Sequence, residues 1–396
     1  MKNNITPRLV GVGTFKMNPR MRLYLNQVLD SGRISYGEKS LAFEKRFAQL
    51  HDCEYAILSN SGTSALEVAL QAMKELNGWN DGDEVIVPAT TFVATANIVV
   101  HNGMNPVFVD VEPITYGINP MHIEKVITDK TRAIIPVHLF GQPCEMQKIM
   151  SIAADHDLLV IEDSCESMFA THHGEYVGSM GDIGCFSTYV AHLIVTGVGG
   201  ICTTNNRAYA AKIRSLVNHG IELEFLNPGD NFAPNPTVGR RFKFDTFGHS
   251  YRITEMEAAL GLAQVDDLFI DDMLKRRHLN ADQLSSGLFK LNKQHNDIFN
   301  IPKTLKYNTH SWMMYPILLD RGTDKEPFMQ YLNEHMIETR DMLPILNQTC
   351  YSYLNPIDFP ISQWIVDSGF YVGCHQDLDS EDIQYVLQTI ESYLEQ

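Results

Sequence analysis

Short apolar runs alternate with segments of helical spacing through the first half of the chain. The runs that predict strands cover residues 83–88, 106–111, 132–138 and 158–163. The segments that predict helices cover residues 89–104, a short turn opened by Asn119 and Pro120, and residues 143–157. Near-continuous apolar strands are typical of a sheet covered on both faces, and their alternation with helices favours parallel pairing. We therefore expect an α/β fold with a mostly parallel sheet.

The second half of the chain predicts a smaller unit. Thr254 and Glu257 have the spacing of a capping box, and they open a helical pattern that runs from Glu255 to about Leu288. This stretch is too long for one crossover and is better read as a bridge to a second lobe. The segments 310–320, 326–336 and 381–395 indicate an α+β domain. We expect a large α/β domain at 1–253, a linking helix and small domain at 254–396, and a surface loop at 222–241.

Composition excludes several classes of partner. The 396 residues carry 31 basic and 48 acidic side chains, a net charge of −17, with no basic run. A nucleic-acid or anionic-membrane partner would need a basic face. No stretch approaches the roughly 18 apolar residues of a membrane span, and the first residues lack the apolar core of a signal peptide, so a cytoplasmic protein is expected. The seven cysteines lie at least 17 positions apart, which supports neither a disulfide framework nor a metal site.

Small residues precede a helical pattern at positions 60–65, which read Asn-Ser-Gly-Thr-Ser-Ala. Free amides at the start of a helix, together with the helix dipole, favour an anion there. The turn is therefore a phosphate seat or a simple helix N-cap, and the motif by itself favours the N-cap.

Two further side chains are candidates for a cofactor site. Asp163 ends a buried strand, where ligands bind in open α/β sheets. Its carboxylate could pair with a ring nitrogen of a cofactor or cap the next helix, and the residues leave these alternatives equal. Phe92 could stack on an aromatic ring, although alone it is better explained as core.

Taken together, a phosphate turn, a stacking aromatic and a strand-end aspartate resemble the fold-type I pyridoxal-phosphate enzymes. More closely, the chain resembles the DegT/DnrJ/EryC1/StrS sugar aminotransferase family. The matching motifs follow in the family's order at 31–37, 61–66, 88–92, 137–143, 162–163, 181–187, 199–200, 248–255, 338–340 and 369–375. Such an ordered set covers almost the whole chain and is highly specific.

The resemblance implies roles for individual residues. Gly62, Thr63 and Ser187 would bind the cofactor phosphate, and Ser64 is a further cofactor-binding candidate. Asp163 would pair with the ring nitrogen, and Phe92 would stack on the ring face. Glu166 would lie near the ring hydroxyl, where the aminotransferases commonly have glutamine. Ser250 stands where the family commonly has an asparagine that reaches the neighbouring subunit's phosphate, so this contact is expected to be weaker.

His192 is the departure that matters most. The family's lysine, which forms a covalent imine with the cofactor and shuttles the proton, sits at this position, and no lysine occurs between Lys148 and Lys212. An imidazole makes no stable imine but can act as a general base. This pattern resembles the dehydratase branch, in which pyridoxal or pyridoxamine phosphate is held non-covalently and the C3 hydroxyl of a nucleotide-linked 4-keto-6-deoxy sugar is expelled.

The resemblance also implies partners. The sugar or nucleotide would contact Arg33, Tyr36, His219, Arg252 and His310, glutamate could regenerate the amine form of the cofactor, and the protein would be a homodimer. Three alternatives stay open: a sugar aminotransferase with an inefficient histidine shuttle, a member whose lysine was mutated to histidine, and a catalytically inactive binding protein. Retention of Asp163 and of the phosphate turn argues against the last of these.

Overall fold

Two sheets organise the chain in the computed structural model, which describes residues 7–35, 37–222 and 243–396. The larger sheet has the order β1-β9-β8-β5-β4-β2-β3. Its strands are β1 (Tyr55–Ser59), β2 (Glu84–Pro88), β3 (Asn105–Val109), β4 (Thr131–Ile134), β5 (Leu159–Asp163), β8 (Ile183–Ser187) and β9 (Gly200–Thr204). Pairing is parallel from β3 through β8, and β9 is antiparallel to both of its neighbours. The predicted α/β fold with a mostly parallel sheet is confirmed.

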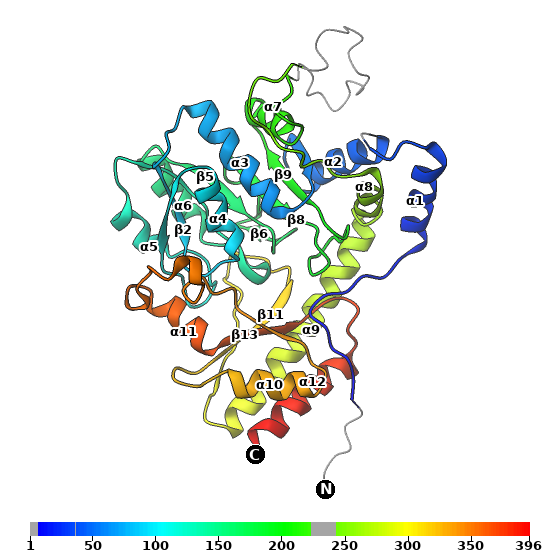
Figure 1. Cartoon of the computed structure of the whole chain (residues 1–396). Helices are drawn as coiled ribbons and strands as arrows, with labels where there is room; N and C mark the ends of the chain where they lie inside the picture. The colour runs from blue at the N-terminus through cyan, green and yellow to red at the C-terminus, as the bar shows by residue number, and fades with distance from the viewer. Residues whose placement is uncertain (1–6, 36, 223–242) are drawn as a thin grey trace.

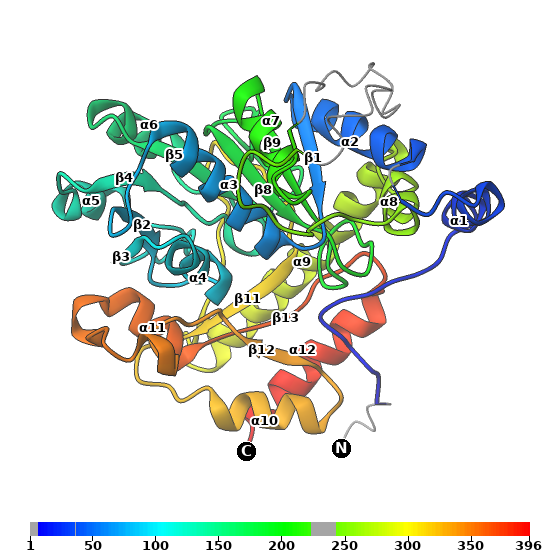
Figure 2. The ribbon, with the colours of Figure 1, turned by 45° about the horizontal axis from the view of Figure 1, so that its top comes forward.

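Helices surround the larger sheet in the upper part of the molecule (Figure 1). They are α1 (Pro19–Ser31), α2 (Glu38–Leu50), α3 (Gly62–Asn77), α4 (Val93–His101), α5 (Pro120–Ile123), α6 (Met146–Asp155) and α7 (Arg207–Leu216). A small hairpin, β6 (Thr171–His172) with β7 (Glu175–Tyr176), follows β5. Figure 2 shows α1 at one edge of the molecule.

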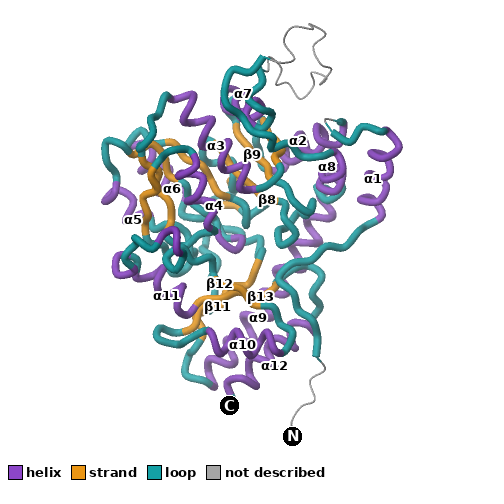
Figure 3. Tube along the Cα trace, viewed as in Figure 1, coloured by secondary structure: helices purple, strands orange, loops and turns teal. Residues whose placement is uncertain are grey.

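The smaller sheet lies below, with the order β10-β11-β13-β12 (Figure 3). Its strands are β10 (Phe299–Asn300), β11 (Met314–Leu319), β12 (Thr339–Asp341) and β13 (Gly369–Gly373), and its helices are α10 (Glu326–Glu334), α11 (Pro360–Ser368) and α12 (Ser380–Leu394). Apolar side chains of α9, α10 and α12 share one core cluster with β11 and β13. Other residues of β11 and β13, including Met314 and Tyr371, belong to the cluster that continues into the larger sheet.

The predicted single helix from Glu255 to Leu288 is wrong. The capping box at Thr254 is present and opens α8 (Glu255–Leu262), but α9 (Asp267–Gln294) begins only after an interruption. At the interruption, Gln264 donates from Nε2 to the carbonyl of Val195 at 2.7 Å and accepts the Val195 N–H at 3.0 Å. A tertiary contact with a distant segment therefore accompanies the break.

The predicted strands and helices of the first half are present with shifted ends. Residues 89–92, expected to be helical, are not helical and include a bridge from Thr90 to Pro344, so α4 begins only at Val93. β4 ends at Ile134 rather than at His138. The predicted loop at 222–241 lies outside the described residues except for Glu222. The domain division at residue 253 stays a prediction. The N-terminal segment contacts the residues before β12, because the N–H of Val10 donates to the carbonyl of Met336 and the N–H of Val12 donates to the side chain of Glu338.

Candidate active site

A cavity of about 340 Å³ lies at the carboxyl ends of β5 and β8, and residues of both sheets line it. From the larger sheet and its loops come Gly62, Thr63, Phe92, Asp163, Glu166, Ser187 and His192, all of them candidates from the sequence. From the smaller sheet come Met314, Arg340 and Tyr371. The sequence order of the motifs thus becomes one site in space.

The turn before α3 is shaped for close approach of a ligand. Ser61 is the N-cap, and its hydroxyl accepts the N–H of Ser64 at 3.0 Å. The first amides of a helix have no acceptor within the helix, so those of Gly62 and Thr63 are available to an anion. A Cβ atom at position 62 would lie 2.7 Å from Cβ of Ser187 and 3.0 Å from Sγ of Cys165. Only glycine therefore allows this turn to pack against the end of β8.

Asp163 reaches the cavity from the last position of β5. Its Oδ2 atom accepts the hydroxyl of Thr95 at 2.7 Å, and its Oδ1 atom accepts the N–H of Cys165 at 3.3 Å. Burial raises the pKa of Asp163, and the two hydrogen bonds oppose that rise. A carboxylate held in this way is ready for a cationic or N–H partner from a ligand.

Glu162, the preceding residue, has the opposite orientation because side chains alternate along a strand. Its carboxylate accepts the N–H groups of Gly178, Met180 and Gly181 at 2.6–2.9 Å. The same carboxylate lies 3.1 Å from Nε2 of His138, and both side chains are fully buried. Since Nδ1 of His138 accepts the N–H of Cys144, the ring donates from Nε2. Glu162 therefore secures the back of the strand that presents Asp163.

Glu166 is held by one backbone group. Its Oε2 atom accepts the N–H of Phe140 at 2.8 Å, and Phe140 has a positive φ of 57°. Burial, with a smaller contribution from Asp163, raises the pKa of Glu166 to about 7. The side chain can therefore exchange a proton near neutral pH.

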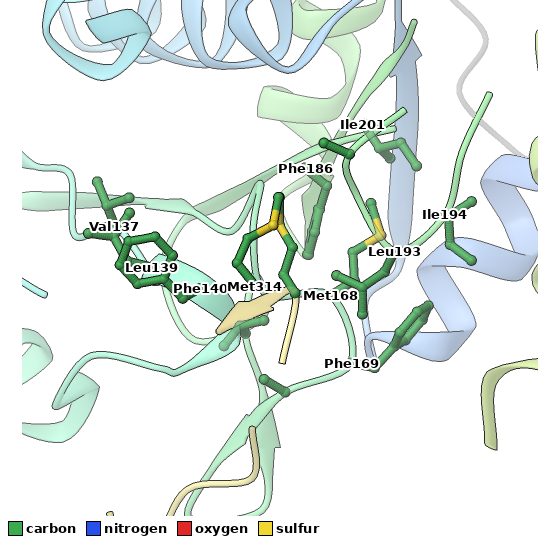
Figure 4. Packing of buried hydrophobic residues seen from close by; sticks show 14 of the residues in the cluster. Val137, Leu139, Phe140, Met168, Phe169, Phe186, Leu193, Ile194, Ile201 and Met314 are labelled. Atoms are coloured by element: carbon green, nitrogen blue, oxygen red, sulfur yellow. The ribbon is translucent and has the colours of Figure 1, made fainter. Parts of the chain in front are cut away.

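His192 lines the cavity between anchored neighbours. Leu193 and Ile194 are buried in the core cluster drawn in Figure 4. The Nδ1 atom of His192 is buried and has no hydrogen-bond partner among the described residues. Burial, and secondarily the charge of Arg277, lowers the pKa of His192 to about 3. The imidazole is therefore neutral, and its buried Nδ1 atom makes no hydrogen bond to a described residue.

Arg340 and Tyr371 were part of matched motifs but received no role from the sequence. The Nε and Nη2 atoms of Arg340 donate to one oxygen of Glu338, at 2.9 and 2.6 Å, and burial raises the pKa of Tyr371. Among the described residues that line this cavity, Arg340 is the one arginine. Residues remote in sequence give no local signal of such proximity, so only the topology of the smaller sheet brings these two here.

Phe92 and Ser64 differ in their access to the site. Phe92 is the N-cap residue of α4, and 57% of its side chain is exposed although it is a large aromatic at the cavity. Ser64 does not line the cavity, and its hydroxyl donates to Oδ1 of Asn60. Ser64 therefore stabilises the turn through hydrogen bonds to Ser61 and Asn60 and does not face the cavity.

The described candidate substrate residues do not line the cavity of this chain. Arg33 and His219 are exposed, Ser250 accepts a hydrogen bond from Arg252 at 2.9 Å, and Tyr36 lies outside the described residues. Tyr251, between Ser250 and Arg252, accepts the N–H of Asn60 through its carbonyl, so this segment passes next to the phosphate turn. His310 is buried, stacks on Trp312 with ring centroids 3.7 Å apart, and accepts the N–H of Trp312. The roles of these residues stay predictions.

Two searches of the described residues bear on other functions. None of the helices they form is both long enough and apolar enough to cross a membrane. Nor do they contain a group of three or more histidine, cysteine, aspartate or glutamate side chains that could hold a metal ion.

A family model described as the DegT/DnrJ/EryC1/StrS aminotransferase family matches residues 16–391. The chain belongs to this family. GDP-perosamine synthase of Caulobacter vibrioides is 35% identical over 389 residues, covering 97% of this chain and 98% of that protein. The predicted family is confirmed, and its proteins include sugar aminotransferases.

Solved structures of family members share the whole architecture. An aminotransferase from Psychrobacter cryohalolentis is 29% identical with a TM-score of 0.84, covering 96% of this chain and 97% of that one. The Escherichia coli GDP-4-keto-6-deoxy-D-mannose-3-dehydratase with bound hydrated PLP is 25% identical with a TM-score of 0.85, covering 96% and 99%. The DegT/DnrJ/EryC1/StrS fold thus serves both an amino-transferring and a dehydrating enzyme.

Proposed function

We propose that this protein is a pyridoxal- or pyridoxamine-phosphate enzyme that removes the C3 hydroxyl of a nucleotide-linked 4-keto-6-deoxy sugar, with His192 as the base. The observation that carries the proposal is the cavity lining. Among the described residues it contains His192 and no lysine. A protein of this family that cannot tether the cofactor covalently has to hold it by non-covalent contacts alone.

The residues present fit the cofactor at three separate places. Gly62 and Thr63 offer helix-start amides to a phosphate beside Ser187, Asp163 offers a carboxylate to the ring nitrogen, and the exposed ring of Phe92 offers a stacking face. When bound, this cofactor supplies an electron sink for the bonds next to its reactive carbon. Gly62, Thr63 and Ser187 would hold its phosphate, and Glu166 would lie at its ring hydroxyl.

His192 is suited to accept a proton rather than to form a covalent bond. A neutral imidazole has a lone pair on one of its two nitrogens, which general-base catalysis needs. The lowered pKa makes it a weak base in the protein alone, and a bound dianionic phosphate would raise that pKa through its charge. Once protonated, the ring can return the proton to a leaving hydroxyl on the same side.

The substrate class rests on relatives that act on nucleotide-linked sugars. Arg340 supplies a guanidinium at the cavity for an anionic group of a substrate or of glutamate. Tyr36 lies outside the described residues. Of the candidate substrate residues that the structure describes, Arg33, His219, Arg252 and His310 do not line the cavity of one chain, so a role for them requires a second subunit or a domain movement. We therefore include a homodimer in the proposal.

An aminotransferase is the second candidate. The names of the relatives favour this candidate, since they include GDP-perosamine synthase and an aminotransferase from Psychrobacter cryohalolentis. In that case His192 would shuttle the proton that a lysine usually carries.

The deciding experiment incubates the protein with pyridoxamine phosphate, glutamate and a panel of nucleotide-linked 4-ketosugars, and the products are weighed by mass spectrometry. Loss of the C3 oxygen is the expected result. Gain of nitrogen with all other oxygens retained would establish the aminotransferase instead. His192→Asn serves as a matched variant, because it keeps a polar side chain of similar size and removes the base.

A further inference from the structure

The segment from Val10 to Thr14, which we call the N-terminal strap, is hydrogen-bonded to residues around the smaller sheet. The carbonyl of Val10 accepts the N–H of Glu338 at 2.8 Å, just before β12. The N–H of Val12 donates to Oε2 of the same glutamate at 3.0 Å, and the hydroxyl of Thr14 donates to Oδ2 of Asp377 at 2.7 Å. The strap is therefore held at its beginning, middle and end.

Gly13 is the point where the strap touches the loop that carries His192. A Cβ atom at position 13 would lie 2.9 Å from Cα of Ala191 and 3.0 Å from the carbonyl oxygen of Val190. Both are backbone atoms of the two residues that precede His192. Gly13 is not among the glycines with a positive φ, so its backbone conformation does not call for glycine. The close approach of the two backbones does.

The loop from Tyr189 to His192 is confined from its other side as well. Leu193, the next residue, is buried in the same core cluster as Val12 of the strap and Ala191 of the loop. The N–H of His192 itself donates to the carbonyl of Tyr189 at 2.9 Å. Because the loop lies between the strap and the core, a displacement of Ala191 is passed on to His192.

We propose that Gly13 is a positioning residue for His192. Since residue 13 has no side chain, the strap lies directly against the backbone of Ala191 and so fixes the place of the imidazole in the cavity wall. That His192 acts as a base rests on the proposed function. The contact between the strap and the loop does not depend on which reaction the site performs.

Gly13→Ala tests this contact, and Gly11→Ala is the matched control in the same strap. The atoms nearest to a Cβ atom at position 11 would be Oε2 of Glu338 and the carbonyl oxygen of Gly13, both at 3.5 Å, which is ordinary van der Waals contact. Gly11 also lacks a positive φ, so alanine by itself strains neither position. The two variants add the same methyl group, and only Gly13→Ala has to displace the loop.

The first measurement uses the full-length protein without cofactor. Amide hydrogen exchange is followed by mass spectrometry of the peptide that covers residues 188–196. Exchange in Gly13→Ala is expected to be about threefold faster than in the wild type, because the displaced loop loses part of its packing. Gly11→Ala is expected to match the wild type.

The second measurement is the half-reaction that both candidate functions share, in which glutamate gives its amino group to bound pyridoxal phosphate and leaves as 2-oxoglutarate. Its rate at saturating glutamate is expected to fall about tenfold in Gly13→Ala, because a displaced base transfers the proton less efficiently. Gly13 does not line the cavity. The half-saturating glutamate concentration and the affinity for pyridoxal phosphate are therefore expected to stay within about twofold of the wild type.

Equal effects of Gly13→Ala and Gly11→Ala, or unchanged exchange in Gly13→Ala, would overturn the proposal. So would a normal rate in Gly13→Ala together with a lost rate in His192→Asn, because the contact would then only stabilise the fold. If Gly13→Ala does not fold, Thr14→Val replaces it. That variant removes the bond to Asp377 and loosens the strap, so faster exchange of residues 188–196 and a lower rate are expected, and wild-type values contradict the proposal.

Failure of the proposed function gives a different result. A normal rate in both Gly13→Ala and His192→Asn would refute the role of His192 as the base. The exchange comparison would then still show whether Gly13 holds the loop, so the two failures are distinguishable.

Discussion

The carboxylate of Glu166 accepts the backbone N–H of Phe140 at 2.8 Å, at a residue whose φ is +57°. One side chain thereby links the loop after β5 to the loop after β4, and both loops reach the cavity. The hydrogen bond stabilises the ionised carboxylate, whereas burial favours its neutral form. Burial is the larger of the two effects, which gives the first prediction.

Replacing Glu166 with glutamine is expected to reduce the pH dependence of stability in the cofactor-free protein. Between the ordinary pKa of about 4.5 and the folded value of about 7, the folded state binds more protons than the unfolded state. The free energy of unfolding therefore falls as the pH rises through this window. Since Glu166 is partly exposed, we expect about 1–2 kcal/mol of this fall to disappear in Glu166→Gln. Urea unfolding at pH 5 and pH 8 measures the fall in the free energy of unfolding for each protein. An equal fall in the wild type and in Glu166→Gln would contradict the prediction.

Asp163→Asn is expected to weaken cofactor binding at least tenfold without loss of stability in the protein alone. An amide can still accept the Thr95 hydroxyl through its oxygen, and it removes a buried carboxylate whose pKa is raised by burial. Titration of pyridoxal phosphate followed by absorbance, alongside thermal unfolding of the cofactor-free protein, checks both halves. Unchanged cofactor affinity would mean that Asp163 does not face the ring.

Borohydride treatment of the protein loaded with pyridoxal phosphate is expected to leave no cofactor on the peptide that contains residue 192. His192→Lys is expected to attach it there, because a lysine at this position can form the reducible covalent bond. Peptide mapping by mass spectrometry locates the label. A stoichiometric label on any lysine of the wild-type protein would refute the non-covalent cofactor.

Gly62→Ala is expected to destabilise the fold by about 1–3 kcal/mol and to lower cofactor affinity, since the new Cβ atom would approach Cβ of Ser187 to 2.7 Å. Combining it with Ser187→Gly makes room for the methyl group. Part of the lost stability should return in the double variant, and strictly additive effects would argue against the contact.

Gln264→Leu is expected to cost about 2–4 kcal/mol, because it leaves both backbone groups of Val195 buried without partners. Gln330→Leu, the same change on the exposed side of α10, is expected to stay within about 0.5 kcal/mol of the wild type. Chemical unfolding of the two variants provides the comparison.

Local sequence patterns predicted the strands of the parallel sheet and the residues at their ends. Asp163 and the turn at Gly62 could be found because a buried strand or helix start marks them within a few positions. Arg340, Tyr371 and Arg277 could not, because their places depend on how β12, β13 and α9 pack against the larger sheet. The ends of β4 and the break after α8 were missed for the same reason, since no glycine or proline stands at the break itself.

The interruption between α8 and α9 coincides with a contact to a residue that is distant in the sequence. The backbone of Val195, 69 residues upstream, takes up the side chain of Gln264 at the interruption. Val195 is only three positions after His192. The same two bonds therefore join the segment that follows His192 to the residues just before α9, so a movement of α9 would displace this segment as well.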